Sequence, residues 1–324
     1  MTVRARFWRI TKRVALILAI LAAAFFFIVV PWFFTRILTT GRFTFPDPNN
    51  DKTPKTYGMD FRGVQFHSSD GILLKAWYMP ASGEPRGTIV YCHGLNRSRV
   101  EMLPEAEFGH ELGYNGLLFD FRHAGQSEGE ITTLGYQERL DVLGAVKYAL
   151  NEEGARRPVV LWGISMGAAA ALMAGADSPD VAAVISDSSF LSFRDTIEHH
   201  WRLFFHLPSF PIADEVIYWS AYRGNFRASD FDLEKAVERI GTRSVLFVAA
   251  EGDRRMPPEI ARRLFERSAS PEKRLLILPG KRHGEAFNQN SEKYKEAVTR
   301  FLEGLQAEGN SKKIKSPPAS ASVK

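Results

Sequence analysis

The stretch VVLWGISMGAAAALMAG, residues 159–175, decides the fold of this chain. Its first residues are mostly β-branched and apolar, as in a buried strand, and its second half is rich in alanine, which favours a helix. The motif Gly163-Ile164-Ser165-Met166-Gly167 lies between the two halves. Gly-x-Ser-x-Gly is informative in such a strand–turn–helix context. We therefore predict that Ser165 occupies a sharp turn and acts as a nucleophile.

The same alternation of strand and helix patterns continues through most of the chain. A hairpin is predicted around Asp70-Gly71. Further strands are predicted at residues 87–92, 114–121, 158–162, 181–186, 244–250 and 274–278. Helices are predicted at residues 100–112, 134–151, 166–175, 259–268 and 291–306. Continuous apolar strands alternating with helices predict an α/β fold with a parallel sheet covered on both faces.

One interval, residues 190–241, contains no strand pattern but many aromatic residues. We interpret it as an inserted helical cap.

Two side chains suited to activating Ser165 follow later strands. A serine hydroxyl is a poor nucleophile without a base. Asp253 comes just after the strand at 244–250, and His283 follows the strand at 274–278. The carboxyl ends of parallel strands are where such sheets build their sites. We predict that His283 takes the proton of Ser165 and that Asp253 orients His283, with Glu251 as the alternative acid.

An oxyanion formed by attack of Ser165 needs two N–H donors. We expect one from the backbone of Met166, at the start of the helix after the serine. The other is expected from Leu95, in the loop after the strand at 87–92. His93 is expected to organise this loop.

These features resemble the α/β-hydrolase superfamily over roughly residues 64–303. The matching features are His93-Gly94, the string Asp120-Phe-Arg-His-Ala-Gly-Gln-Ser127, the Ser165 motif, the Asp253 loop and His283-Gly284. The branch with the greatest resemblance is the serine aminopeptidase-like or prolyl-oligopeptidase-like group. The resemblance implies an α/β-hydrolase fold with a mainly parallel eight-stranded sheet, a Ser165–Asp253–His283 triad and a cap before the acid.

The predicted function is hydrolysis of a carboxylic ester or related acyl bond, with a small-molecule or lipid-like acyl substrate and no cofactor. The alternatives are a serine peptidase acting on short peptides and a non-catalytic binding protein on a hydrolase fold. Cys92 is the single cysteine, which excludes an intramolecular disulfide and a zinc site built on thiolates. A metal site at His199, His200 and His206 is less favoured than solvent-facing histidines.

The net charge of +5 comes from the two ends of the chain. Residues 1–13 carry five basic residues, residues 312–324 carry four, and neither range has an acid. The remainder has 33 basic residues against 37 acidic ones. A basic nucleic-acid-binding face is therefore not expected.

Residues 14–34 contain no charge and are long enough to cross a bilayer as a helix, which takes about 20 residues. The basic leader, residues 1–13, predicts a cytoplasmic N-terminus and an extracytoplasmic catalytic domain. A cleaved signal peptide and a buried core helix are the alternatives. We further expect a linker over residues 35–55, the hydrolase domain over residues 56–308 and a disordered tail over residues 309–324.

Overall fold

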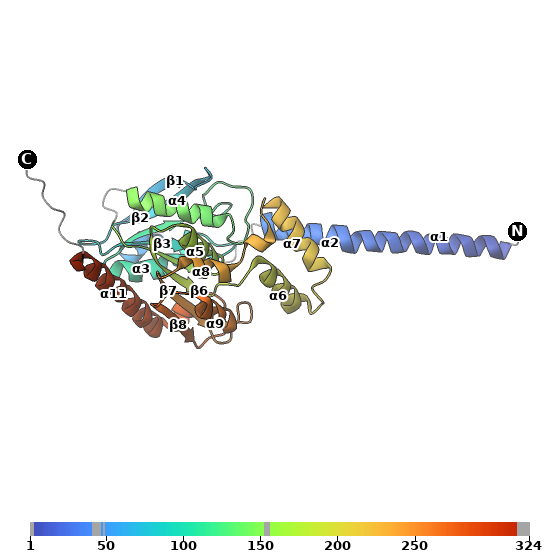
Figure 1. The fold of residues 1–324 in the computed structure, drawn as a ribbon. Coiled ribbons are helices and arrows are strands. Elements are labelled where there is room, and N and C mark those ends of the chain that lie inside the picture. The colour runs from blue at the N-terminus through green and yellow to red at the C-terminus, as the bar shows by residue number, and fades with distance from the viewer. Residues whose placement is uncertain (1–2, 41–46, 48, 152–155, 316–324) are drawn as a thin grey trace, which may run out of the picture.

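Eight strands form one sheet at the centre of the molecule (Figure 1). The computed structural model describes residues 3–40, 47, 49–151 and 156–315. The strands are β1(Arg62–His67), β2(Leu73–Met79), β3(Thr88–Cys92), β4(Asn115–Phe119), β5(Val159–Ile164), β6(Val181–Asp187), β7(Ser244–Ala250) and β8(Lys273–Leu278). The predicted mainly parallel sheet is confirmed, because β3 to β8 run parallel while β1 and β2 are antiparallel to their neighbours.

The strand order β1-β2-β4-β3-β5-β6-β7-β8 creates a switch point at β3. The chain leaves β3 toward β4 on one side, and β5 lies against β3 on the other side. A crevice forms at the carboxyl ends of strands where connections diverge in this way. The loop that contains Leu95 follows β3 and Ser165 follows β5, so the topology brings these two residues to the same edge.

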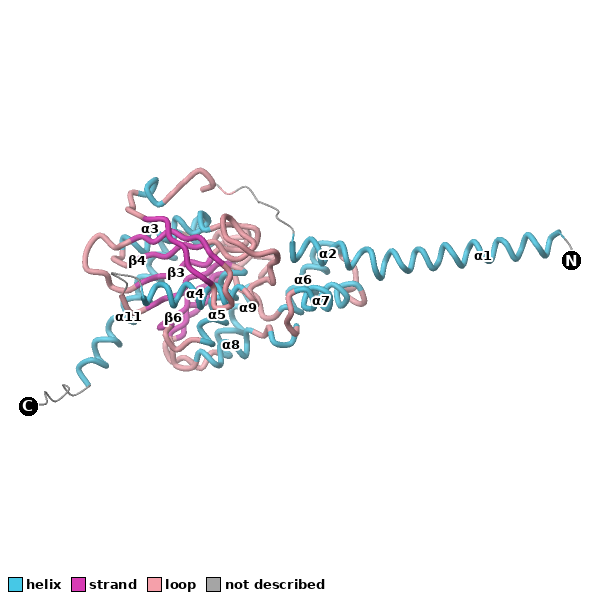
Figure 2. The backbone as a smooth tube through the Cα atoms, turned by 90° about the horizontal axis from the view of Figure 1, so that it is seen from above, coloured by secondary structure: helices cyan, strands magenta, loops and turns pink. Residues whose placement is uncertain are grey.

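Helices cover both faces of the sheet (Figures 1 and 2). Adjacent residues of β5 enter different cores, because Val159 and Leu161 pack on one face and Val160 and Trp162 on the other. The first face is covered by α4(Glu138–Asn151), α5(Met166–Asp177), α8(Leu233–Ile240) and α9(Pro258–Arg267). The second is covered by α3(Leu103–Glu111), α10(Ala286–Gln289) and α11(Ser291–Lys315).

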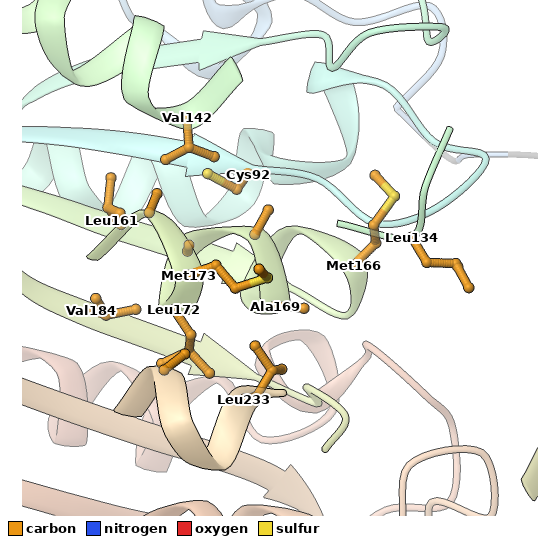
Figure 3. Packing of buried hydrophobic residues seen from close by; sticks show 14 of the residues in the cluster. Cys92, Leu134, Val142, Leu161, Met166, Ala169, Leu172, Met173, Val184 and Leu233 are labelled. Atoms are coloured by element: carbon orange, nitrogen blue, oxygen red, sulfur yellow. The ribbon is translucent and has the colours of Figure 1, made fainter. Parts of the chain in front are cut away.

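The helix that follows Ser165 lies deep in the first core. Figure 3 shows side chains of the sheet, such as Cys92 and Leu161, and Leu233 of α8 gathered around α5. The alanines at positions 168–171 are fully buried. Their small side chains let α5 approach the sheet closely, which fixes the position of Ser165 at the amino end of this helix.

A long helix precedes the domain. It comprises α1(Val3–Ala24), a π-helical turn η1(Phe25–Val29) and α2(Val30–Thr40). The π turn ends two residues before Pro31, which has no N–H to donate to a regular helical bond. The stretch Arg6–Thr40 is long and apolar enough to cross a membrane, and very little of its most apolar part is buried by the rest of the structure.

A linker is expected over residues 35–55. In the structure, residues 35–40 are instead helical and belong to α2. One face of α2 is buried against the cap through Pro31, Thr35 and Thr39. This packing keeps the threonines helical despite their modest helix propensity. Residues 41–46 and 48 lie outside the described residues, and the 3₁₀ helix η2(Pro54–Tyr57) leads into β1.

The predicted cap is helical. It contains α6(Phe193–Phe205) and α7(Ile212–Arg223), and Figures 1 and 2 place both beside α2. The last helix of the interval, α8, packs against α5 and belongs to the main domain instead. At the other end of the chain, α11 reaches Lys315, beyond the expected start of a tail at Gly309, and residues 316–324 lie outside the described residues.

Candidate active site

Ser165 occupies a strained turn between β5 and α5. Its backbone angles are φ 55° and ψ −116°, a conformation that side-chain-bearing residues rarely adopt. Two glycines make this turn possible. A Cβ atom on Gly163 would lie 2.4 Å from the backbone carbon of Gly167, and one on Gly167 would lie 2.0 Å from the carbonyl oxygen of Cys92. The turn therefore presents the Ser165 hydroxyl at the carboxyl edge of the sheet.

A continuous series of hydrogen bonds joins Ser165, His283 and Asp253. The Oγ atom of Ser165 lies 2.8 Å from Nε2 of His283. On the other side of the ring, Nδ1 lies 2.7 Å from Oδ2 of Asp253. The His283 side chain is 10% exposed and that of Asp253 is 1% exposed, so water has little access to the bond between them. The structure thus brings together the three residues that sequence reasoning selected, from loops after three different strands.

The Asp253 carboxylate is fixed by its own loop. Its Oδ1 accepts hydrogen bonds from the backbone N–H groups of Arg255, at 2.8 Å, and Met256, at 3.0 Å. Burial works against the charge on Asp253, but the hydrogen bond from His283 and these two N–H groups outweigh it and hold the pKa of Asp253 below its usual value. The alternative acid, Glu251, is exposed, and its backbone N–H bonds to the carbonyl of Leu278.

The loop after β3 lies against the same site. Leu95 and Met166, the two expected oxyanion donors, both line the pocket that contains Ser165. Met166 is the first residue of α5, where backbone N–H groups have no partner within the helix. His93 is fully buried and links this loop to the segment that follows β4. Its Nδ1 donates to the carbonyl of Gly94 at 2.8 Å, and its Nε2 accepts from the N–H of Phe121 at 3.1 Å.

A pocket of about 270 Å³ opens beside Ser165. Its walls are mainly apolar and come from the Leu95 loop, from α6 of the cap and from α2. The α2 residues are Phe34, Ile37 and Leu38. No aspartate or glutamate lines the pocket among the described residues. The site therefore combines a hydroxyl hydrogen-bonded to an imidazole with an apolar chamber, which suits attack on the carbonyl of an apolar acyl group.

Comparisons with known proteins support the fold. A family model described as "Serine aminopeptidase, S33" matches residues 83–213. The protein YqkD of Bacillus subtilis is 29% identical over 78% of this chain and 78% of its own length. YfhR of Escherichia coli K12 is 26% identical over 90% of this chain and 96% of its own length. The structure of the esterase Pf2001 of Pyrococcus furiosus, 24% identical, superposes with a TM-score of 0.66 over 80% of this chain and 98% of that one.

The chain has an α/β-hydrolase fold, and its sequence is similar to members of that superfamily. The strand order, the turn at Ser165 and the cap inserted after β6 all fit this assignment. The matches identify the fold of this protein, and none of them assigns its substrate.

Sequence reasoning missed two carboxyl groups near the site, of which Asp187 is buried and Glu101 is partly buried. The backbone carbonyl of Asp187 accepts the N–H of Ser165 at 2.8 Å, and its carboxyl Oδ1 accepts the hydroxyl of Ser188 at 2.8 Å. Burial raises the pKa of Asp187 above its usual value. The second group is Glu101, whose Oε2 accepts the N–H of Gly94 at 2.6 Å. Asp187 directly follows the strand predicted at residues 181–186, which is the signal that pointed to Asp253, whereas Glu101 lies in the helix predicted at residues 100–112.

The cap histidines of the hydrolase lie differently from expectation. The rings of His199 and His200 meet edge-on with centroids 5.7 Å apart, both side chains are only partly exposed, and His200 lines the pocket. Nδ1 of His200 donates to the carbonyl of Thr196 at 2.8 Å, and Nε2 is buried with no hydrogen-bond partner among the described residues. Burial lowers the pKa of His200 to about 4, so the ring is neutral at pH 7. Its Nε2 is then an acceptor.

Groups able to hold a metal are absent from the described ranges. No three His, Cys, Asp or Glu side chains come together there in a suitable arrangement. Cys92 is buried beneath the Ser165 turn, and burial raises the pKa of its thiol.

Proposed function

We propose that this protein is a membrane-anchored serine hydrolase that cleaves a carboxylic ester through an acyl-enzyme on Ser165. The observation that carries the proposal is the hydrogen-bonded series from Ser165 through His283 to Asp253 beside an apolar pocket. Two structural neighbours are esterases, Pf2001 of Pyrococcus furiosus and acetyl xylan esterase 1 of Thermoanaerobacterium, and their activity supports the proposal.

The first half of the reaction acylates the enzyme. Nε2 of His283 accepts the Ser165 proton while Oγ forms a bond to the substrate carbonyl carbon. The carbonyl oxygen becomes an oxyanion, which the N–H groups of Leu95 and Met166 stabilise. The tetrahedral species then collapses: the bond from carbon to the alcohol oxygen breaks, and the imidazolium gives its proton to that oxygen. An alcohol leaves and an acyl-enzyme ester remains.

The second half releases the acid. A water molecule takes the place of the alcohol, and His283 removes one of its protons as the oxygen attacks the acyl carbon. The same two N–H groups stabilise the second oxyanion. Collapse returns the proton from His283 to Oγ of Ser165 and frees the carboxylic acid. Asp253 stays ionised throughout and stabilises the imidazolium, in keeping with its lowered pKa.

A peptidase is the second candidate, since the matching family model is described as a serine aminopeptidase. An enzyme that removes amino-terminal residues must hold a protonated amine, and a buried amine needs a carboxylate partner. No acid lines the pocket among the described residues. This composition supports an apolar acyl group over a charged amino terminus.

A fluorophosphonate probe tests the mechanism, since it labels serines that are activated for acyl chemistry. We expect the full-length protein in detergent to be labelled and Ser165→Ala to be unlabelled. Ser186→Ala is a matched control, because this serine lies on β6 beside Gly163 and its buried hydroxyl has no hydrogen-bond partner in the described part of the chain. Equal labelling of Ser165→Ala, or no labelling of the folded wild type, would overturn the proposal and favour a non-catalytic binding protein.

A substrate panel then separates the two catalytic candidates. p-Nitrophenyl esters of increasing acyl length and aminoacyl p-nitroanilides are compared on the same preparation. Hydrolysis of esters with kcat/KM rising with acyl length is the expected result. Faster turnover of the aminoacyl anilides would replace the esterase proposal with a peptidase.

A further inference from the structure

Exposed large apolar side chains of this protein occur in only two places among the described residues. One is the amino-terminal helix and the other is the cap. The cap members form a cluster over α6, α7 and the loop between them: Phe204, Phe205, Leu207, Phe210, Tyr218, Trp219 and Tyr222. An exposed apolar patch of this kind marks an interaction surface.

The cap is fastened along the end of the membrane helix. Nε of Arg223, at the carboxyl end of α7, donates to Oγ1 of Thr39 at 3.2 Å, and the carbonyl of Thr39 accepts the N–H of Thr132 at 2.9 Å. The ring of Phe34 packs edge-on against Trp201, with centroids 5.3 Å apart, and against Phe205 at 5.1 Å. Helix and cap therefore share one packed interface.

The helices α2 and α7 run parallel, and this direction sets the depth of the cap. Since Arg223 is beside Thr39, the part of α7 that contacts η1(Phe25–Val29) must be its amino end. The loop before α7, with Leu207 and Phe210, then lies near the level of Val29. Val29 is about 7.5 Å from Phe34 along the helix axis, toward the amino end, at 1.5 Å per helical residue. If residues 14–34 cross the bilayer, the cap loop enters it to the depth typical of interfacial segments.

The pocket continues into this region. Phe34 and Ile37 of the anchor line it, and so do Phe204 and Phe205, which also belong to the exposed cluster. One wall of the chamber beside Ser165 is therefore built by side chains that face the membrane. An acyl chain can move from the leaflet into the pocket along apolar surface without crossing water.

We propose that the cap is inserted in the bilayer interface and that the pocket takes its substrate, a membrane-resident acyl ester lipid, laterally from the leaflet around the anchor. The proposal rests on the serine hydrolase function and adds to it the substrate class and its route. It makes α2 both an anchor and a wall of the substrate site.

Insertion is tested without reference to activity. Phe210→Cys is labelled with the environment-sensitive dye NBD and placed in vesicles of phosphatidylcholine and phosphatidylglycerol. The native Cys92 is buried and its thiol pKa is raised, so labelling is confined to the new site. We expect quenching by lipids with a nitroxide on the acyl chain and protection from aqueous iodide. A label at Ser82→Cys, exposed on the main domain, is the control and should show the reverse. Iodide quenching at position 210 equal to that at position 82 would overturn the proposal.

The route is tested with Leu207→Glu/Phe210→Glu in the same vesicles. These residues are exposed and lie outside the pocket lining, while the charges they introduce oppose insertion. We expect hydrolysis of a vesicle-borne lipid ester to fall about tenfold or more, equivalent to about 1.4 kcal/mol, with p-nitrophenyl butyrate hydrolysis unchanged. Gln65→Glu/Ser82→Glu adds the same charge at exposed positions of the main domain and should change neither rate.

The outcomes are distinguishable from failure of the hydrolase proposal. Loss of lipid hydrolysis with retained butyrate hydrolysis supports lateral entry. Unchanged lipid hydrolysis, or an equal loss on both substrates in a folded variant, refutes it while Ser165 chemistry stands. A wild type that hydrolyses neither substrate and fails to react with fluorophosphonate refutes the hydrolase function itself. The quenching of the NBD label at position 210 then still shows whether the cap is inserted in the bilayer.

Discussion

The carboxylate of Glu101 accepts a 2.6 Å hydrogen bond from the backbone N–H of Gly94, the residue before Leu95. Its other oxygen lies 3.2 Å from Nε of Arg97. One side chain, in the 3₁₀ turn Arg99–Met102 that precedes α3, thus holds both sides of the loop from which an oxyanion donor is proposed. The donor geometry at Leu95 depends on this carboxylate, although Glu101 does not line the pocket.

Removing this support should lower kcat more than it raises KM. We expect Glu101→Ala to reduce kcat by about tenfold to a hundredfold, since a displaced oxyanion donor weakens binding in the transition state more than in the ground state. Glu101→Gln keeps an oxygen acceptor for the N–H of Gly94 and should recover most of the activity. Steady-state kinetics on a short p-nitrophenyl ester measure this. Equal damage by Ala and Gln would show that the charge, and not the hydrogen bond to Gly94, is what the loop requires.

The same residue predicts how stability depends on pH. Burial raises the pKa of Glu101 from 4.5 to about 7, against the opposing hydrogen bond from Gly94 and the nearby Arg97. The folded protein binds this proton more tightly than the unfolded chain does, so the contribution of Glu101 favours folding below pH 4.5 and is lost as pH rises to about 7. Relative to Glu101→Gln, the thermal midpoint of the wild type should fall by several degrees over this interval. Parallel thermal curves for the two proteins would contradict the prediction.

Gly167 should be intolerant of any side chain. A Cβ atom there would meet the carbonyl oxygen of Cys92 at 2.0 Å, and both backbones are held in the core between β3 and α5. We expect Gly167→Ala to lower the thermal midpoint strongly and to abolish fluorophosphonate labelling. Gly83→Ala is the matched control, because nothing lies within 4 Å of a Cβ at that position. A Gly167→Ala protein as stable as the control would show that β3 can move away from the turn.

The choice between Asp253 and Glu251 is open to a direct test. Asp253→Asn leaves the loop bonds from Arg255 and Met256 possible but removes the charge that stabilises the His283 imidazolium. A loss of about 10³–10⁴ in kcat is expected, as for the removal of a triad acid in other serine hydrolases. Glu251→Gln, with an exposed side chain, should retain wild-type kcat. The opposite ranking would assign the acid to Glu251.

The orientation in the membrane follows from the charges at the amino end. Residues 1–13 carry five basic residues and no acid, which predicts a cytoplasmic N-terminus and an extracytoplasmic hydrolase domain. Protease added to spheroplasts should therefore digest the domain, and a tag at the N-terminus should be protected. A protected domain and a digested tag would reverse the orientation, and absence of residues 1–34 from the purified protein would show a cleaved signal peptide.

Local pattern in the sequence was sufficient for the strand, turn and helix around Ser165. Strands and helices have different hydrophobic periodicities, so the sequence indicates where each begins and ends. Gly163 and Gly167 occupy positions where no Cβ atom fits, so the two glycines indicate the turn between strand and helix. Chain order and the ends of strands also selected Asp253 and His283 for the site. Their hydrogen bonds with Ser165 follow from the parallel sheet, which gathers the carboxyl ends of β5, β7 and β8 at one edge.

Only the tertiary structure decided what surrounds those three residues. The sequence of α2 reads as the end of a membrane segment and the start of a linker, yet Phe34 and Ile37 line the pocket because α7 packs along the same helix. Glu101 and His200 look like ordinary surface residues of helices, and their roles arise from the loop and pocket that they face. The hydrophobic pattern of a helix shows which of its faces is buried. It does not show which distant segment of the chain covers that face.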